Sequence, residues 1–276
     1  MAFVLDKEGN FLPVYGETSG GGGTTDHAQL TNLSYADSGH TGFMSSANYI
    51  PSGTTLTVKA DGSGDFETIA DAVNHLTGKW SDGEVKIRIA AGTHTVSSNI
   101  SIDGAKFNIP FITIYGDAKA TSIIQFSGAA NANAISILNV NASLVSNFTV
   151  TRITNTKTGV GFEINNTCLG VNGIEVSNFA TGILGTLPSD IQLRADISIS
   201  DCNIGIQAQR FTKIVTYGST AVNLTNLTTG WSVLTGGLIT TSTTITNVTY
   251  TNVTNKCSQT VGTFNSNGFI GGTLQN

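Results

Sequence analysis

Apolar and polar residues alternate in short runs along most of the chain, and the run at 85–89 (Val-Lys-Ile-Arg-Ile) is typical of them. Strict alternation of this kind indicates a strand with one buried face. Apart from the stretch at 66–76, no run shows the spacing of an amphipathic helix. The pattern therefore predicts an all-β chain built from many short strands.

A longer repeat lies within this alternation. Segments 174–183 and 197–206 share the order apolar-x-apolar-Ser-(Asn/Asp), followed after three residues by Gly-Ile. Val150, Val176 and Ile199 occupy equivalent positions, at separations of 26 and 23 residues. A repeat of that length without an internal helix matches one coil of a β-helix. We therefore expect 85–276 to form a right-handed parallel β-helix with a β-rich C-terminal tip.

The alternative all-β architectures are a sandwich and a jelly roll. Both require antiparallel hairpins, whose two-residue turns are commonly Asn-Gly or Asp-Gly. Such turns are scarce here, which favours the β-helix. Beyond Thr240 the pattern changes to short Asn-Val-Thr repeats, which fit either the final coils or a trimerising tip.

One helix is predicted, at 65–77, after a first strand at 56–60. Its apolar positions fall on one helical face. They are Phe66, Ile69, Ala70, Val73 and Leu76. Asp65 is the expected N-cap, and Gly78 is expected to end the helix. A helix laid across the open end of a β-helix would cover its apolar side chains and unpaired backbone groups, so we assign 56–84 to the first strand and a capping helix.

Two small segments precede this part. Residues 1–25 contain two short apolar runs and a tether of four glycines, which is typical of a docking peptide on a flexible link, although a frayed terminus is the alternative. The candidate anchoring residues are Phe3, Val4, Leu5, Phe11, Leu12 and Val14. Residues 26–55 are too few to fold alone and are expected to pack against copies of themselves or against the next domain.

Composition narrows the function. Charged residues make up 11% of the chain, hydrophobic residues 39%, and the net charge is −5. Without a basic patch, nucleic-acid binding is not expected. The chain shows no signal peptide and no apolar run long enough to insert into a membrane. Cys168, Cys202 and Cys257 form an odd, widely spaced set, so we expect inert thiols, with no metal site and no cofactor.

The segment at 57–73, Thr-Val-Lys-Ala-Asp-Gly-Ser-Gly-Asp-Phe-Glu-Thr-Ile-Ala-Asp-Ala-Val, resembles the opening of pectin methylesterases and of the wider pectate-lyase-like β-helix superfamily. The resemblance implies the fold, because in that family this segment forms the first strand and the capping helix. It implies no activity. The Asp-Phe-x-Phe-Gly context of the esterase nucleophile has no match in the coils, so we do not expect a recognisable catalytic constellation.

The segment at 26–43 resembles a module of bacteriophage fibre and tail-appendage proteins. The resemblance rests on His27-Ala28, Leu30, Asn32-Leu33, Tyr35-Ala36 and Ser38-Gly39-His40-Thr41-Gly42-Phe43. It implies a homotrimer on the surface of a phage particle, joined through its N-terminus to a head or tail protein. The implied trimer-assembly residues are Leu30, Leu33, Tyr35, His40 and Phe43.

Candidate chemistry along the coils is sparse. Glycosidases need two carboxylates about 5–10 Å apart. Glu175 and Asp196 are the best pair, with Arg194 and Arg210 as possible neighbours, although an ordinary solvated strand face is the favoured alternative. Polysaccharide lyases need Ca²⁺-binding acidic clusters, and the coils contain none.

Aromatic rings provide the other candidates. Trp231, Tyr217 and Tyr250 are candidates for stacking on sugar rings, with core packing as the alternative. The four histidines form no motif, and packed or solvated imidazoles are favoured over a metal site on a trimer axis.

These observations favour a structural phage appendage that displays a β-helix for attachment to host cell-surface glycans. The alternative is a tailspike-type polysaccharide depolymerase or a carbohydrate esterase on the same fold. A bacterial cell-surface adhesin is a third hypothesis, which the missing signal peptide weakens.

Overall fold

The structure is a computed structural model, which describes residues 3–5, 11–13, 46–140, 143–217, 221–241, 248–259 and 262–265. The chain divides into two units, Met1–Ser45 and Ser46–Asn276. In the first unit, β1 (Phe3–Leu5) and β2 (Phe11–Pro13) pair antiparallel, with Val4 opposite Leu12. The two short apolar runs of residues 1–25 thus contain paired strands.

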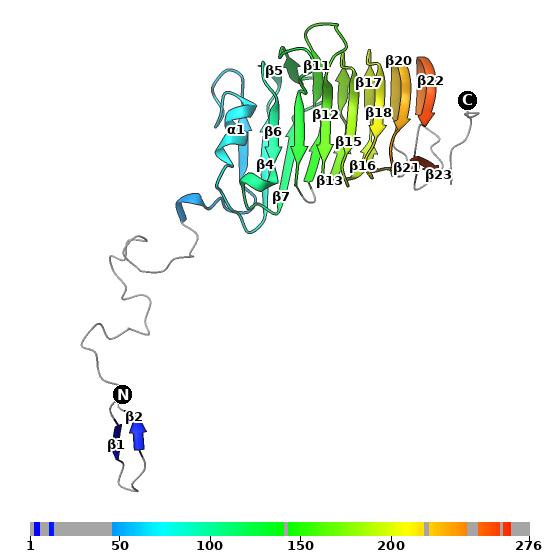
Figure 1. Ribbon diagram of the computed structural model, residues 1–276. Coiled ribbons are helices and arrows are strands. Elements are labelled where there is room, and N and C mark those ends of the chain that lie inside the picture. Colours follow the sequence, from blue (N-terminus) through cyan, green and yellow to red (C-terminus); the bar gives the residue numbers. More distant parts are fainter. Residues whose placement is uncertain are drawn as a thin grey trace. The chain divides into compact units, whose positions relative to one another are not determined.

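The second unit is a parallel β-helix, in which strands from successive coils stack along the column (Figure 1). The described strands of the first sheet are all parallel. In spatial order they are β3 (Thr55–Val58), β4 (Glu84–Ile89), β7 (Phe111–Gly116), β10 (Ser143–Ser146), β13 (Cys168–Asn172), β16 (Asp190–Ala195), β19 (Lys213–Thr216), β21 (Gly237–Thr241) and β23 (Gly262–Asn265).

The second sheet has two parallel tracks, which the long strand β20 (Val222–Val233) joins. One track contains β5 (Gly92–Val96), β8 (Ser122–Phe126), β11 (Thr149–Arg152), β14 (Glu175–Ser177) and β17 (Ile197–Ser200). The other contains β6 (Ile100–Asp103), β9 (Ile135–Leu138), β12 (Val160–Asn165), β15 (Thr181–Thr186) and β18 (Ile204–Ala208). Strand β22 (Val248–Gln259) pairs with β20, so the described part of the Asn-Val-Thr stretch continues the coils.

The alternation seen in the sequence produces the core. In β4 every second residue is buried, because successive side chains of a strand point to opposite faces. Val150 pairs with Val176, and Val176 with Ile199, all three fully buried. The predicted repeat and the predicted parallel β-helix are thus confirmed.

Strand β3 and helix α1 (Ile69–His75) lie at the N-terminal end of the column (Figure 1). Helix α1 packs against β3 and β6 and buries Ile69, Ala72 and Val73. It therefore covers part of the open end, as expected of the capping helix.

The predicted helix bounds of 65–77 were wrong, because α1 is shorter. The backbone of Phe66 is bonded to Thr57 and Lys59 and is extended, which prevents a helix from starting there. Thr68 is the N-cap, and its hydroxyl accepts from the backbone N–H of Asp71 at 3.1 Å. Asp65, the predicted N-cap, instead accepts from the backbone N–H of Thr57 at 2.7 Å.

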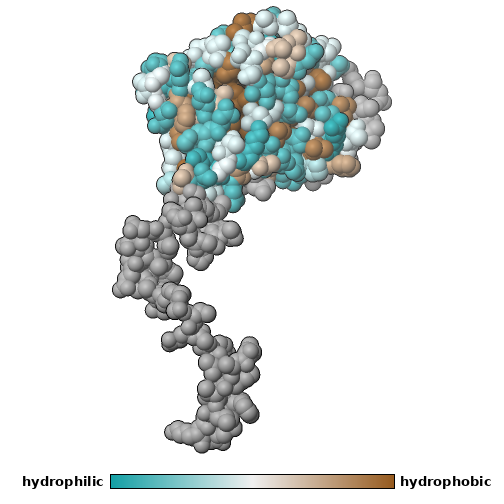
Figure 2. Space-filling model, turned by 60° about the vertical axis from the view of Figure 1, so that its left-hand side comes forward, coloured by the Kyte–Doolittle hydropathy of each residue, from teal (hydrophilic) through white to brown (hydrophobic). Residues whose placement is uncertain are grey.

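Two short 3₁₀ helices complete the elements, η2 (Ser46–Asn48) and η3 (Gly104–Lys106). Figure 2 shows a face of the second unit that is mostly hydrophilic, with hydrophobic residues in small scattered groups. Any ligand site on that face must therefore come from local features and not from one large apolar surface.

Candidate functional site

A row of left-handed residues follows one corner of the column. Each member comes just after a strand of the second track, and strand register makes the members equivalent from coil to coil. This corner row consists of Asn139, Asn166, Leu187, Arg210 and Thr235, at φ 54°, 49°, 59°, 52° and 36°. Asn tolerates a left-handed backbone, whereas a bulky residue such as Leu rarely adopts one.

The first members of the corner row form a side-chain ladder. The amide of Asn139 donates to Asp103 Oδ1 at 2.9 Å, and the amide of Asn166 donates to Asn139 Oδ1 at 2.9 Å. The next position is Leu187, which has no amide, so the ladder ends at Asn166. Its Oδ1 oxygen accepts no hydrogen bond from the described residues.

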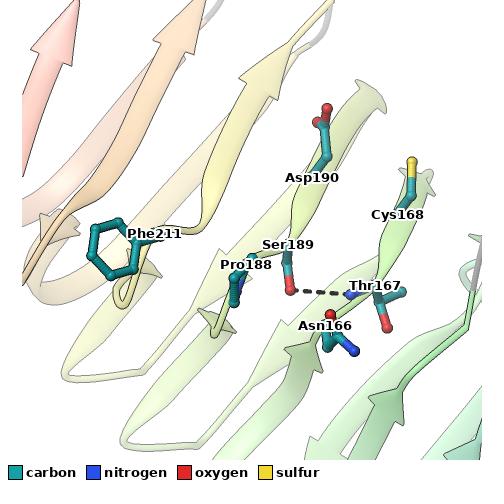
Figure 3. Close-up of a pocket in the computed structure, with 7 residues that line it drawn as sticks. All are labelled: Asn166, Thr167, Cys168, Pro188, Ser189, Asp190 and Phe211. Atoms are coloured by element: carbon teal, nitrogen blue, oxygen red, sulfur yellow. Dashed lines mark hydrogen bonds between the residues drawn. The ribbon is translucent and has the colours of Figure 1, made fainter.

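A shallow pocket of about 340 Å³ lies at this break in the ladder (Figure 3). It is lined by Asn166, Thr167, Cys168, Pro188, Ser189, Asp190 and Phe211. Ser189 Oγ accepts from the backbone N–H of Thr167 at 3.3 Å, which ties two neighbouring coils at the pocket floor. We call this site the corner pocket.

Asp190 supplies the charged group of the corner pocket. Cys168 and Asp190 are paired neighbours at the start of β13 and β16, and their side chains project to the same side (Figure 3). Asp190 Oδ2 lies 3.9 Å from Nζ of Lys213, the next residue in the same row. Oδ1 is buried and has no hydrogen-bond partner among the described residues, which is unusual for a buried acceptor. The Asp190 side chain as a whole is 42% exposed, so its carboxylate can accept a hydrogen bond from a ligand hydroxyl.

Phe211 supplies the apolar surface of the corner pocket. It is 73% exposed, the largest exposure among the large hydrophobic residues of the described structure, and its backbone is left-handed at φ 67°. A Cβ on Gly236 would lie 2.9 Å from the Phe211 ring, so Gly236 lets the ring rest against backbone. One edge of the ring is therefore supported while much of it faces solvent.

Together these groups suit a sugar. An exposed aromatic ring can cover the apolar face of a pyranose, and nearby oxygen atoms can accept hydrogen bonds from its hydroxyl groups. Sequence reasoning missed Phe211, because its exposure depends on a left-handed turn. The available indication was that Leu187 and Arg210 follow the strands at positions where earlier coils have Asn.

The predicted catalytic pair is arranged differently from expectation. Glu175 pairs with Ser198, as the repeat predicted. Asp196 lies in the turn before β17, at φ 33°, instead of on the strand, and its carboxylate is 2.7 Å from Nζ of Lys119. Lys119 Nζ also lies 3.5 Å from Ser198 Oγ. Asp196 is thus held in an ion pair that links distant coils.

The two arginines named as possible neighbours of this pair lie outside β14 and β17. Arg194 donates to Gln192 Oε1 at 2.8 Å, and its guanidinium lies over Gly170 on the first sheet. Arg210 belongs to the corner row. The actual neighbour, Lys119, is 77 residues from Asp196 in sequence, so no local pattern could indicate it.

The three predicted glycan-binding aromatics differ in exposure. Trp231 is 1% exposed and lies in the core, where its Nε1–H donates to the Tyr250 hydroxyl at 3.0 Å. Tyr250 is half-buried, and Nζ of Lys256 lies 5.5 Å from its ring centroid. Tyr217 is 41% exposed. Core packing, the alternative interpretation, therefore describes Trp231.

The N-terminal candidates are only partly described. Phe3, Val4, Leu5, Phe11 and Leu12 lie in β1 and β2. Val14 and the assembly residues lie outside the described residues. Those assembly residues are Leu30, Leu33, Tyr35, His40 and Phe43. Within the described ranges, no helix is long and apolar enough to span a membrane. The same ranges hold no cluster of three or more His, Cys, Asp or Glu side chains that suits a metal ion.

Comparison with known proteins gives only similarity of fold. No protein-family model and no curated protein matches the chain. A pectin methylesterase from carrot is 15% identical, with a TM-score of 0.40, and the match covers 79% of this chain and 85% of that one. Pectin methylesterase PemA from Erwinia chrysanthemi is 11% identical, with a TM-score of 0.41, and the match covers 72% of this chain and 80% of that one. Similarity at this level assigns no activity.

Proposed function

We propose that this chain is a host-attachment appendage of a phage particle and that its β-helix binds cell-surface glycans at the corner pocket. The observation that carries the binding proposal is Phe211, an exposed ring on a left-handed backbone that lines the same pocket as the Asp190 carboxylate and the Asn166 amide. Exposing a phenyl ring and bending its backbone both cost stability, and such costs are commonly retained at functional sites. The phage assignment rests on the resemblance of 26–43.

A bound sugar would use the three groups together. Its apolar face would rest on Phe211, a contact expected to contribute about 1 kcal/mol. Its hydroxyls would donate to the Asp190 carboxylate and to Asn166 Oδ1, and hydrogen bonds to a charged acceptor are worth about 1.5–3 kcal/mol each. A single pocket of this kind gives weak binding, and several chains displayed on one particle would raise the avidity.

The test measures binding of the full chain to purified bacterial surface polysaccharides by biolayer interferometry. Phe211→Ala and Asp190→Asn should each weaken binding about tenfold or more, which corresponds to about 1.4 kcal/mol. Phe111→Ala is the matched control, because Phe111 is also exposed, at 45%, but lies on β7 and does not line the pocket. Equal losses in all three variants would refute a specific role for the corner pocket.

A thiol-protection assay locates the bound glycan independently. Cys168 lines the corner pocket, whereas Cys202 is fully buried, which raises the pKa of its thiol to about 11. In a Cys257→Ser background, alkylation near pH 8 should modify Cys168, and bound polysaccharide should slow it. Unchanged alkylation at a saturating polysaccharide concentration would place the bound glycan elsewhere.

The second candidate function is glycan cleavage, by a depolymerase or a carbohydrate esterase. Glu175 and Asp196 are its candidate carboxylates, but the ion pair with Lys119 holds Asp196 and leaves it less suited to bind a substrate. Prolonged incubation with the same polysaccharides should release neither reducing ends nor free acid. Release that disappears in Glu175→Gln would establish the enzyme in place of the binding protein.

A further inference from the structure

We infer that the corner pocket selects acidic glycans, with the sugar carboxylate held by Lys213 and Arg210. This inference rests on the proposed glycan binding and names the class of ligand. Its starting point is an uneven distribution of charge. Residues 202–276 contain three basic residues and no acidic one, so the remaining ten basic residues and all 18 acidic ones precede them. Phe211 lies within this stretch, between Arg210 and Lys213.

Lys213 is the first cation of this site. It begins β19 and pairs in register with Asp190 of the corner pocket. The distance of 3.9 Å from Lys213 Nζ to Asp190 Oδ2 is at the outer limit of an ion pair, and the two side chains are 48% and 42% exposed. Exposed pairs of this kind contribute little to stability. The ammonium group is therefore free to take a ligand anion without loss to the fold.

Arg210 is the second cation. It is exposed, directly precedes Phe211 and belongs to the corner row. Its guanidinium makes no ion pair or hydrogen bond with the described residues, although its backbone N–H donates to Thr235. An arginine held on a left-handed turn without a partner for its charge is well suited to bind a carboxylate, because its fork of N–H donors matches carboxylate geometry.

The placement of charges also orients the sugar. Asp190 repels a ligand carboxylate and accepts hydroxyls, so the acid group must lie on the side of Lys213 and Arg210. A uronic acid meets both requirements in one ring, with hydroxyls toward Asp190 and the apolar face on Phe211. A neutral sugar uses only Phe211 and Asp190, and it leaves the two cations to water. The pocket should therefore prefer the acidic polymer.

The experiment compares uronic-acid-containing capsular polysaccharides with the same polymers after chemical reduction of their carboxyl groups. Binding to the full chain is measured for each pair at low and high ionic strength. The native polymers should bind about tenfold more tightly, and the difference should shrink as salt screens the charges. Lys213→Gln and Arg210→Gln should weaken binding of the native polymer and leave the reduced polymer unaffected. Lys106→Gln, an exposed cation near the other end, is the control.

The possible outcomes separate this inference from the proposed function. Equal affinity for native and reduced polymers, with both lost in Phe211→Ala, would overturn acid selection and leave glycan binding at the corner pocket intact. Binding of neither polymer would overturn both. A preference for the native polymer that Lys106→Gln removes as effectively as Lys213→Gln would reduce the effect to general charge attraction and overturn the assigned site.

Discussion

At the scale of single residues, the left-handed positions show where this fold departs from its lowest-energy choices. The corner row begins with two asparagines, whose amides bond to the coil before them. Leu187 and Arg210 then occupy the same backbone conformation with neither the tolerance nor the hydrogen bond of Asn. Leu187 is also 39% exposed, so burial does not compensate for its conformation. Local strain without local benefit is expected at a site retained for binding.

Replacing Leu187 with Asn should stabilise the protein. A left-handed backbone costs an ordinary residue about 1–2 kcal/mol, and Asn recovers part of that cost. The new amide would also lie in line with Asn166 and extend the ladder. We expect Leu187→Asn to raise the free energy of unfolding in urea by about 1 kcal/mol. It should also weaken glycan binding, because it fills the break that forms the corner pocket.

Leu184→Asn is the control for this substitution. Leu184 lies on β15, three residues earlier, and its backbone is not left-handed. The same change there relieves no strain, so the free energy of unfolding should fall or stay constant. If Leu187→Asn and Leu184→Asn lower the free energy of unfolding equally, the left-handed conformation of Leu187 is not a source of strain that Asn relieves.

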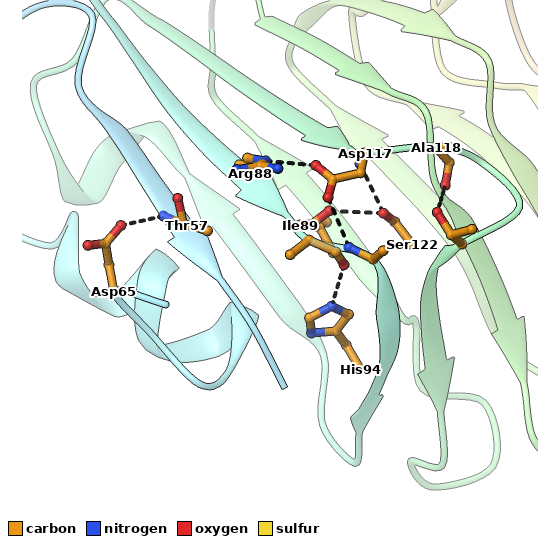
Figure 4. Close-up of polar contacts among 11 residues, drawn as sticks. Thr57, Asp65, Arg88, Ile89, His94, Asp117, Ala118 and Ser122 are labelled. Atoms are coloured by element: carbon orange, nitrogen blue, oxygen red, sulfur yellow. Dashed lines mark hydrogen bonds and ion pairs between the residues drawn. The ribbon is translucent and has the colours of Figure 1, made fainter. Parts of the chain in front are cut away.

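At the scale of elements, carboxylates hold the turns of neighbouring coils together. Asp117 follows β7 and accepts from Arg88 Nε at 2.7 Å and from the backbone N–H of Ala91 at 3.1 Å (Figure 4). Ser122 Oγ, close by, accepts from the Asp117 backbone N–H and donates to the carbonyl of Ile89. Asp103 heads the asparagine ladder in the same way. The coils that carry these two carboxylates are thereby fixed to their neighbours at a corner as well as through their strands.

These contacts predict acid sensitivity. The hydrogen bond from Arg88 lowers the pKa of Asp117, and the one from Asn139 lowers the pKa of Asp103. A carboxyl whose pKa is lower in the folded than in the unfolded state adds stability above its unfolded pKa, which is about 3.9. That stability is lost as the pH falls through the lower folded pKa. Urea midpoints should therefore decrease between about pH 4 and about pH 2.

Substitutions identify the groups responsible. Asp117→Asn and Asp103→Asn should each lower stability at neutral pH and reduce the loss on acidification, because the titrating group is gone. Glu67→Gln is the control, since Glu67 is exposed and accepts no hydrogen bond from the described residues. If the urea midpoint falls as steeply on acidification in the two variants as in the parent chain, these carboxyls are excluded as the cause.

At the scale of the whole molecule, the sequence predicted the column better than the site on it. The coil repeat is visible because core positions such as Val150, Val176 and Ile199 must be apolar in every turn. The corner pocket depends on the backbone conformation of Leu187 and Phe211, which side-chain periodicity does not reveal. Likewise, Lys119 meets Asp196 only because several coils of stacking bring them together. Which residues meet between coils depends on the length of each coil. Because the turns vary in length, the coil length cannot be read from the sequence.

The last prediction concerns the oligomeric state of the full chain, which the proposed phage appendage requires to be a trimer. If 26–43 is a trimerising segment, light scattering of the full chain should give about three times the 28.7 kDa of one chain. Charge placed on its apolar positions, as in Leu30→Asp with Leu33→Asp, should produce monomers, because buried like charges on a three-fold axis repel. The same change at exposed Leu187 is the control. A full-length chain that is monomeric at micromolar concentration would contradict the trimer, whereas a trimer that survives both substitutions would locate assembly in the β-helix instead.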